Sequence, residues 1–112
     1  MRKHIEQHIS IPFRTLKDPA YLGLSAVSKS ILEQMLVYYY PNNPNRHIGM
    51  SYREVRDLLG YSFELISKSF KELIEKKFIT LQSKGGLNTA STYSINDKYF
   101  KLKDEYFSLR FP

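Results

Sequence analysis

The stretch from Ser51 to Ser62 signals one helix start, one helix stop and a second helix start in quick succession. Ser51 followed by Glu54 is the pattern of a capping box, in which each side chain satisfies a backbone N–H of the other residue. Gly60 can take the left-handed conformation that ends a helix, and Ser62 is a good N-cap for the next helix. The sequence therefore predicts two short helices joined by a tight turn, which forces them to cross steeply.

The second of these helices, expected over residues 62–77, has two chemically different faces. Its apolar residues recur at helical spacing and should face the core: Phe63, Ile66, Phe70, Leu73 and Ile74. Its polar residues lie opposite: Glu64, Ser67, Lys68, Lys71 and Glu75. In the first helix we expect Tyr52, Val55, Leu58 and Leu59 to face inward.

A hairpin follows the two helices. Residues 78–81 and 92–95 are rich in β-branched and aromatic side chains, which is typical of strands. The loop between them contains Gly85 and Gly86, which permit positive φ angles. Upstream, an apolar face from Val27 to Tyr39 predicts a helix that begins at the N-cap Ser25 and ends by Tyr40, before Pro41. Residues 48–50 can form a small strand.

The predicted order resembles that of the winged helix-turn-helix proteins of bacterial chromosomes, plasmids and prophages, over residues 13–95. It is also similar to the N-terminal winged-helix domain of plasmid replication initiators. The residues that carry the resemblance are Asp18-Pro19-Ala20-Tyr21, Leu24-Ser25, Gly49-Met50-Ser51-Tyr52-Arg53-Glu54, Leu59-Gly60-Tyr61-Ser62, Ile66-Ser67-Lys68-Ser69-Phe70-Lys71-Glu72-Leu73, Phe78-Ile79 and Gly85-Gly86. The chain departs from the family at Phe63-Glu64-Leu65, where small or basic residues are common.

The resemblance implies a mainly α fold with a three-helix core and a small β-hairpin wing. We expect this domain over residues 25–96, preceded by an N-terminal extension at 1–24. Residues 97–112 form an aromatic tail, which would either cover the domain's own core or supply a dimer interface. The expected partner is double-stranded DNA, in transcriptional regulation or in plasmid or phage replication. Reading a palindrome would require a homodimer.

The charge agrees with this partner, since a net charge of +6 and a pI near 9.5 suit a polyanion. A projecting helix fits the major groove and presents its outward side chains to base edges. Those predicted contacts are Phe63, Glu64, Ser67, Lys68 and Lys71. Glu64 could accept a hydrogen bond from cytosine N4, although it would also repel phosphate.

Other residues are predicted to hold phosphates. Arg53 and Arg56 lie on the helix that crosses the DNA backbone in such folds, and free amides at Ser51 can bind an anion. Arg46 precedes the small strand. In the wing, residues 82–91, Lys84 supplies charge, and Gly85 and Gly86 let the backbone approach DNA closely.

Each of these residues also has a simpler interpretation. Lys68 and Lys71 could be ordinary solvated side chains, and Phe63 could belong to the core. Exposed Phe63 and Leu65, with the acidic Glu64, would suit a protein-interaction module in a larger assembly. An electropositive surface over the second helix and the wing would favour DNA, whereas an apolar patch there would favour a protein partner.

The sequence argues against catalysis and against a bound cofactor. It contains no cysteine, which excludes disulfides and thiolate metal sites and agrees with a cytoplasmic location. We find no phosphate-binding loop, nucleophile elbow or paired acidic motif. His4 and His8 could share a helix face, but no third metal ligand is near them. Glu72 is expected on a solvated helix face, and no apolar run reaches the ~20 residues of a membrane span.

Overall fold

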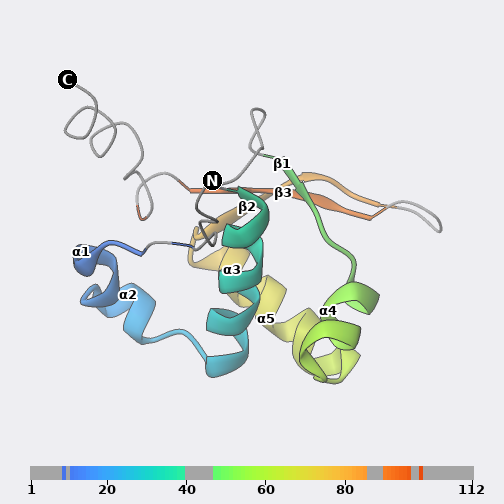
Figure 1. Ribbon diagram of the computed structural model, residues 1–112, viewed down its shortest axis with the longest axis horizontal. Coiled ribbons are helices and arrows are strands. Elements are labelled where there is room, and N and C mark those ends of the chain that lie inside the picture. Colours follow the sequence, from blue (N-terminus) through green and yellow to red (C-terminus); the bar gives the residue numbers. More distant parts are fainter. Residues whose placement is uncertain (1–8, 10, 40–46, 86–89, 97–98, 100–112) are drawn as a thin grey trace, which may run out of the picture.

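The computed structural model describes residues 9, 11–39, 47–85, 90–96 and 99 (Figure 1). It is mainly helical, with a three-stranded antiparallel sheet whose order is β1-β3-β2, which confirms the predicted fold class. In Figure 1 the sheet lies across one side of the molecule, and α3, α4 and α5 lie on the other. The elements are α1 (Phe13–Leu16), α2 (Pro19–Leu22), α3 (Ala26–Tyr39), β1 (His47–Gly49), α4 (Tyr52–Leu59), α5 (Phe63–Glu75), β2 (Ile79–Ser83) and β3 (Thr92–Ile95).

The predicted caps of the two central helices are present. The Glu54 N–H donates to Ser51 Oγ at 3.1 Å, and the Ser51 N–H donates to Glu54 Oε1 at 3.0 Å, which completes the capping box. Gly60 ends α4 in the left-handed conformation, with φ 81° and ψ 11°. Ser62 Oγ accepts a hydrogen bond from the Leu65 N–H at 3.3 Å and so caps α5. The turn is therefore specified by local bonds that the sequence reveals.

The predicted inward face of α4 is only partly correct. Val55 is 2% exposed and Leu59 is half-buried, but Leu58 is 59% exposed and Tyr52 is 36% exposed. α4 has eight residues, and Val55 is the one whose side chain is buried. The ring of Tyr52 instead stacks on Phe70 of α5, with 5.1 Å between ring centroids. Tyr52 therefore lies at the edge of the core, where its ring covers Phe70.

The sheet joins the segments on both sides of the central helices. β3 lies between β1 and β2, and it pairs with each of them in antiparallel register, Ile48 with Tyr93 and Ile79 with Ile95. β1 starts one residue earlier than predicted, at His47. β2 continues to Ser83 rather than ending at residue 81, with a bulge between Leu81 and Ser83. The hairpin is therefore longer than its composition indicates.

The core lies between α3, α5 and the sheet. Its largest fully buried side chains are Phe70, Phe78, Ile31, Leu32, Met35, Leu36, Ile48, Ile66, Leu73 and Ile79. Tyr21 and Leu24 belong to the same cluster, so the segment around α2 packs on it as well. The boundary at residues 24 and 25 stays a prediction, as does the role of the aromatic tail, most of which lies outside the described residues.

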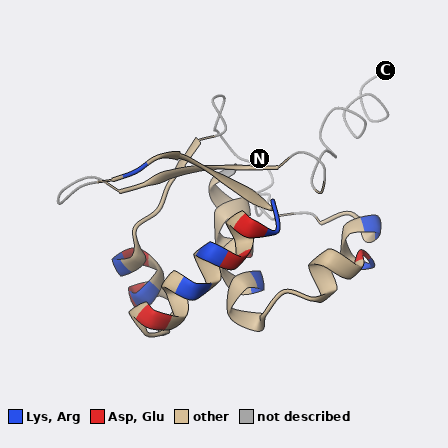
Figure 2. Ribbon diagram, turned by 180° about the vertical axis from the view of Figure 1, so that it is seen from behind, with Lys and Arg blue, Asp and Glu red and all other residues tan. Residues whose placement is uncertain are grey.

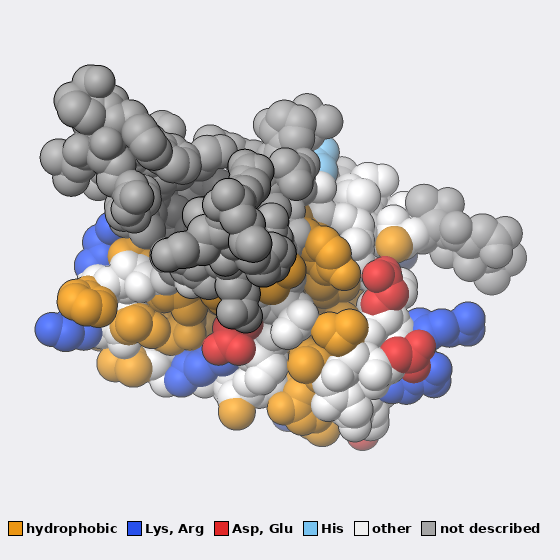
Figure 3. Space-filling model, in the orientation of Figure 1, with side chains coloured by type: hydrophobic (Ala, Val, Ile, Leu, Met, Phe, Trp, Pro, Cys, Tyr) orange, Lys and Arg blue, Asp and Glu red, His pale blue; other side chains and the backbone are white. Residues whose placement is uncertain are grey.

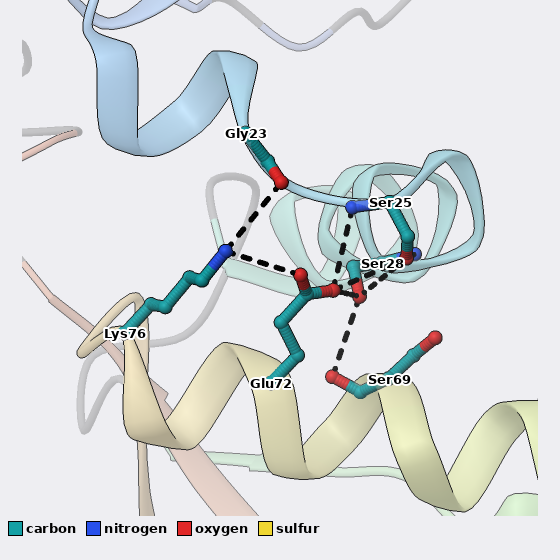
Figure 4. A network of polar contacts seen from close by, with 6 residues as sticks. All are labelled: Gly23, Ser25, Ser28, Ser69, Glu72 and Lys76. Carbon is teal, nitrogen blue, oxygen red and sulfur yellow. Dashed lines mark hydrogen bonds and ion pairs between the residues drawn. The ribbon is translucent and has the colours of Figure 1, made fainter.

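A polar network fastens α5 to the start of α3 (Figure 4). Ser25 caps α3, because its Oγ accepts a hydrogen bond from the Ser28 N–H at 3.1 Å. Glu72 Oε1 accepts hydrogen bonds from the Ser25 N–H at 3.3 Å, from Ser25 Oγ at 3.1 Å and from Ser28 Oγ. Its other oxygen pairs with Lys76 Nζ at 3.2 Å. The expectation that Glu72 lies on a solvated face is therefore wrong, because α3 covers that side of α5.

Candidate nucleic-acid interface

The outer face of α5 carries most of the residues predicted to contact DNA. Glu64, Lys68 and Lys71 are exposed along it, and Ser67 is half-buried. α5 extends over Phe63–Glu75, slightly shorter than the predicted 62–77, because Lys77 takes a left-handed conformation with φ 63°. The helix therefore presents a continuous outward surface whose start is fixed by the Ser62 cap.

This surface has mixed charge. In Figure 2, basic and acidic residues are mixed along α4 and α5. On α5 the exposed Lys68 and Lys71 lie between the exposed carboxylates of Glu64 and Glu75. Among the described residues neither lysine has an ion-pair partner, so both ammonium groups are open to an external anion. An electropositive surface was expected to favour DNA, and an apolar patch a protein partner. The outer face of α5 is neither of these.

Phe63 and Arg56 meet across the turn. Phe63 is the first residue of α5 and is 45% exposed. Arg56 Cζ lies 4.8 Å from the centroid of its ring, a cation–π arrangement. Nε and Nη2 of Arg56 both donate to Asp57 Oδ1, each at 3.2 Å. Two predicted contact residues are thus brought together, and Asp57, which the sequence analysis missed, joins them. Nothing in the local pattern distinguishes Asp57 from an ordinary solvated acid.

Arg53 and Ser51, the other two predicted contacts at the start of α4, differ in how accessible they are to an anion. Arg53 is exposed. The N–H of Ser51 already donates to Glu54 Oε1, so an anion at this helix end would compete with that carboxylate. The capping box therefore weakens the case for Ser51 as a phosphate-binding residue.

The wing is described up to Gly85 and again from Ala90. Lys84 is exposed, and the Gly85 N–H donates to Ser91 Oγ at 2.9 Å, which closes the described part of the hairpin. Across the same pair of strands, Gln82 Nε2 donates to Ser94 Oγ at 2.7 Å. Gly86 and Arg46 lie outside the described residues. In Figure 1 the hairpin formed by β2 and β3 extends toward the side on which α4 lies.

Exposed apolar side chains also gather away from α5. On the face shown in Figure 3 they lie over α1 and α2, and again where α3 meets α4. Exposed large apolar side chains of these four helices are Phe13 and Leu16 on α1, Leu22 on α2, Val37 and Tyr38 on α3, and Leu58 on α4. On α5, Leu65 is 44% exposed, whereas the ring of Phe63 is partly covered by Arg56. Phe63, which the apolar pattern of the helix placed toward the core, is nevertheless exposed, and that part of the prediction is wrong.

Two kinds of feature are absent from the described residues. No group of three or more His, Cys, Asp and Glu side chains in that part of the chain could hold a metal ion. No helix there is long and apolar enough to cross a membrane.

Comparisons with known proteins identify the fold. No protein-family model matches the chain, and no curated protein matches it. One similar solved structure is the N-terminal domain of a DNA-binding protein, with 13% identity, a TM-score of 0.53, and coverage of 98% of this chain and 94% of that one. Another is a Rep–DNA complex, with 14% identity, a TM-score of 0.52, and coverage of 98% and 96%. The chain has the winged-helix fold that its sequence predicted.

Proposed function

We propose that the chain binds duplex DNA, with α5 in the major groove and with α4 and the wing on the flanking phosphates. The observation that carries the proposal is a pair of exposed lysines, Lys68 and Lys71, on the outer face of a capped helix, where neither has an ion-pair partner among the described residues. Such a helix fits the major groove, which is about 12 Å wide. Lys68 and Lys71 can bind guanine or phosphate there, and Arg53, Arg56 and Lys84 supply positioning contacts without base information.

The two similar structures support this proposal, since one is part of a DNA-binding protein and the other contains DNA. The second also favours a role in replication over one in transcriptional regulation. A protein of this kind acts by binding, so we propose that it has no catalytic activity of its own. Two copies bound as a homodimer would read the two halves of a palindromic site.

A protein-interaction module is the second candidate function. It is favoured by the exposed Leu65 and by the carboxylates of Glu64 and Glu75 beside the lysines. Leu65 would then contact a partner protein, and Phe63 would remain a secondary contact, because Arg56 already covers part of its ring.

The test is fluorescence anisotropy with a labelled random-sequence duplex at several salt concentrations. We expect binding whose affinity falls steeply with salt, because each neutralised phosphate releases counterions. Lys68→Glu/Lys71→Glu should lower the affinity at least about tenfold and reduce the salt slope by about 2. Lys17→Glu, a charge reversal at the exposed end of α1, is the control and should change the affinity much less.

Absence of binding by the wild-type chain at low salt would refute the DNA proposal for this chain. Binding that Lys17→Glu weakens as much as Lys68→Glu/Lys71→Glu would show a general charge effect, and the proposed role of α5 would be wrong. In the first case a partner protein at Leu65 becomes the leading function.

A further inference from the structure

Three side chains form a stack across the turn between α4 and α5. The guanidinium of Arg56 lies over the ring of Phe63, with 4.8 Å from Cζ to the centroid. On the α4 side, Asp57 Oδ1 accepts two hydrogen bonds from the same guanidinium, both at 3.2 Å. The turn keeps these elements in register, since Gly60 is left-handed and its N–H donates to the Arg56 carbonyl at 2.8 Å.

The stack leaves part of the guanidinium open. Arginine has five N–H donors in a rigid plane, and Asp57 takes one from Nε and one from Nη2. Among the described residues Asp57 is the only hydrogen-bond acceptor of the Arg56 side chain, so Nη1 and the second Nη2 hydrogen remain available. The Arg56 side chain is 44% exposed, so an external anion can reach those donors.

The contacts with Phe63 and Asp57 also orient the remaining N–H donors of Arg56. A free arginine loses side-chain entropy when it binds a phosphate, whereas one already held by a ring and a carboxylate loses less. A planar pair of arginine donors suits bidentate binding of a carboxylate or a phosphate, and phosphate is the anion that DNA supplies. Because Phe63 is the first residue of α5, the held guanidinium lies beside the end of the helix that would enter the groove.

Building on the proposed function, we propose that Phe63 is a positioning residue for Arg56 and does not read a base. Its ring holds the guanidinium so that Arg56 binds a backbone phosphate at the edge of the major groove. This gives the departure from the family at Phe63-Glu64-Leu65 a specific role, because a small side chain at position 63 would leave Arg56 without the ring beneath it. Phe63 then contributes to affinity and to its salt dependence, and not to sequence preference.

A double-mutant cycle tests the proposal, with wild type, Phe63→Leu, Arg56→Gln and the double variant titrated on a random duplex at several salt concentrations. Arg56→Gln should reduce the salt slope by about 1. Phe63→Leu should weaken binding about two- to fivefold, the range set by an exposed cation–π contact. In the Arg56→Gln background, Phe63→Leu should have almost no further effect, because the two residues act through one contact. Phe63→Tyr keeps the ring and should bind like the wild type.

A measurement without DNA accompanies the cycle. In the free protein the Arg56 Nε–H NMR signal should be shifted upfield by the ring of Phe63, and the shift should be lost in Phe63→Leu and kept in Phe63→Tyr. Retention of that shift in Phe63→Leu would overturn the assignment of the pair.

The DNA titrations separate this proposal from the proposed function. If the wild type binds but the effects of the two substitutions multiply independently, or Phe63→Leu changes which sequences are selected from a random pool, the positioning role is wrong while DNA binding stands. If the wild type fails to bind even at low salt, the proposed function fails and the positioning role with it.

Discussion

Glu72 on α5 accepts a hydrogen bond from the backbone N–H of Ser25, the residue that caps α3, 47 positions away in the chain. In most capping boxes the carboxylate comes from the helix that is being capped. Here it comes from the helix that we propose enters DNA. The same contact therefore completes the start of α3 and fixes the rotation of α5 about its own axis, which decides which side chains face outward.

This contact should make stability depend on pH. Burial would raise the pKa of Glu72, but hydrogen bonds from the Ser28 hydroxyl, the Ser25 backbone and Lys76 outweigh it and lower the pKa below the ordinary value of 4.5. A carboxyl whose pKa is lowered by folding contributes stability above its unfolded pKa, and that stability is lost as the pH falls through the folded pKa. Glu72→Gln should therefore reduce the free energy of unfolding by about 1–2 kcal/mol at pH 7.

Urea denaturation from pH 7 to pH 3 checks this expectation. The difference between wild type and Glu72→Gln should be constant near neutral pH and should shrink as the pH falls below 4.5. Glu75→Gln is the control, since Glu75 is exposed on the same helix and should matter little. A difference that stays constant down to pH 3 would contradict the role given to the Glu72 carboxylate.

The turn offers a second prediction. A Cβ at Gly60 would meet no atom within 4 Å, so Gly60→Ala carries no steric clash, but its φ of 81° is costly for any side chain. We expect the free energy of unfolding to fall by about 1–2 kcal/mol. Gly49→Ala is a matched control, because its Cβ would also meet no atom within 4 Å and its φ is not positive. Thermal unfolding of the two variants compares them, and equal losses would show that backbone conformation is not the cause.

Glu54→Gln should separate helix capping from DNA binding. Glutamine keeps an oxygen that can accept the Ser51 N–H, so the free energy of unfolding should change by less than about 0.5 kcal/mol. The loss of one negative charge beside the start of α4 should at the same time strengthen DNA binding at low salt. Circular dichroism melting and anisotropy on the same preparations give both quantities. Unchanged affinity would place the start of α4 away from the phosphates.

Ser62→Asp should have the opposite effect on binding. Aspartate is as good an N-cap as serine and should preserve the bond to the Leu65 N–H, so stability should be kept or slightly raised. The new negative charge lies at the end of α5 that would face DNA and should weaken binding severalfold at low salt. Ser62→Ala, which removes the cap, should instead lower the free energy of unfolding by about 1 kcal/mol. Equal DNA affinity in wild type and Ser62→Asp would argue against insertion of α5 by this end.

The features that the sequence predicted well are those decided by neighbouring residues. The capping box at Ser51 and Glu54, the stop at Gly60 and the cap at Ser62 depend on backbone bonds within one helical turn. Periodicity likewise placed Ile66, Phe70 and Leu73 in the core, because α3, α4 and β2 pack against that side of α5. It failed at Phe63, the first residue of the helix, which is 45% exposed.

The features that the sequence missed depend on residues far along the chain or on the exact geometry of the turn. The solvated position expected for Glu72 was wrong because α3 lies beside it, and helical periodicity says nothing about which helix will be the neighbour. Leu58 fits the apolar stripe of α4, yet it is 59% exposed. The approach of Arg56 to Phe63 depends on the turn angle, which no spacing rule gives.

The position of β3 in the sheet has a consequence for how the protein is made. Both β1, which leads into α4, and β2, which follows α5, pair with β3. In sequence, α4 and α5 therefore lie between two strands that both pair with β3. β3 is also the last of the three strands to leave the ribosome. While a nascent chain stops short of residue 92, α4 and α5 can form as individual helices but have no sheet to set their orientation. The surface that we propose contacts DNA would therefore be assembled in a single late step, when β3 inserts between its two partners.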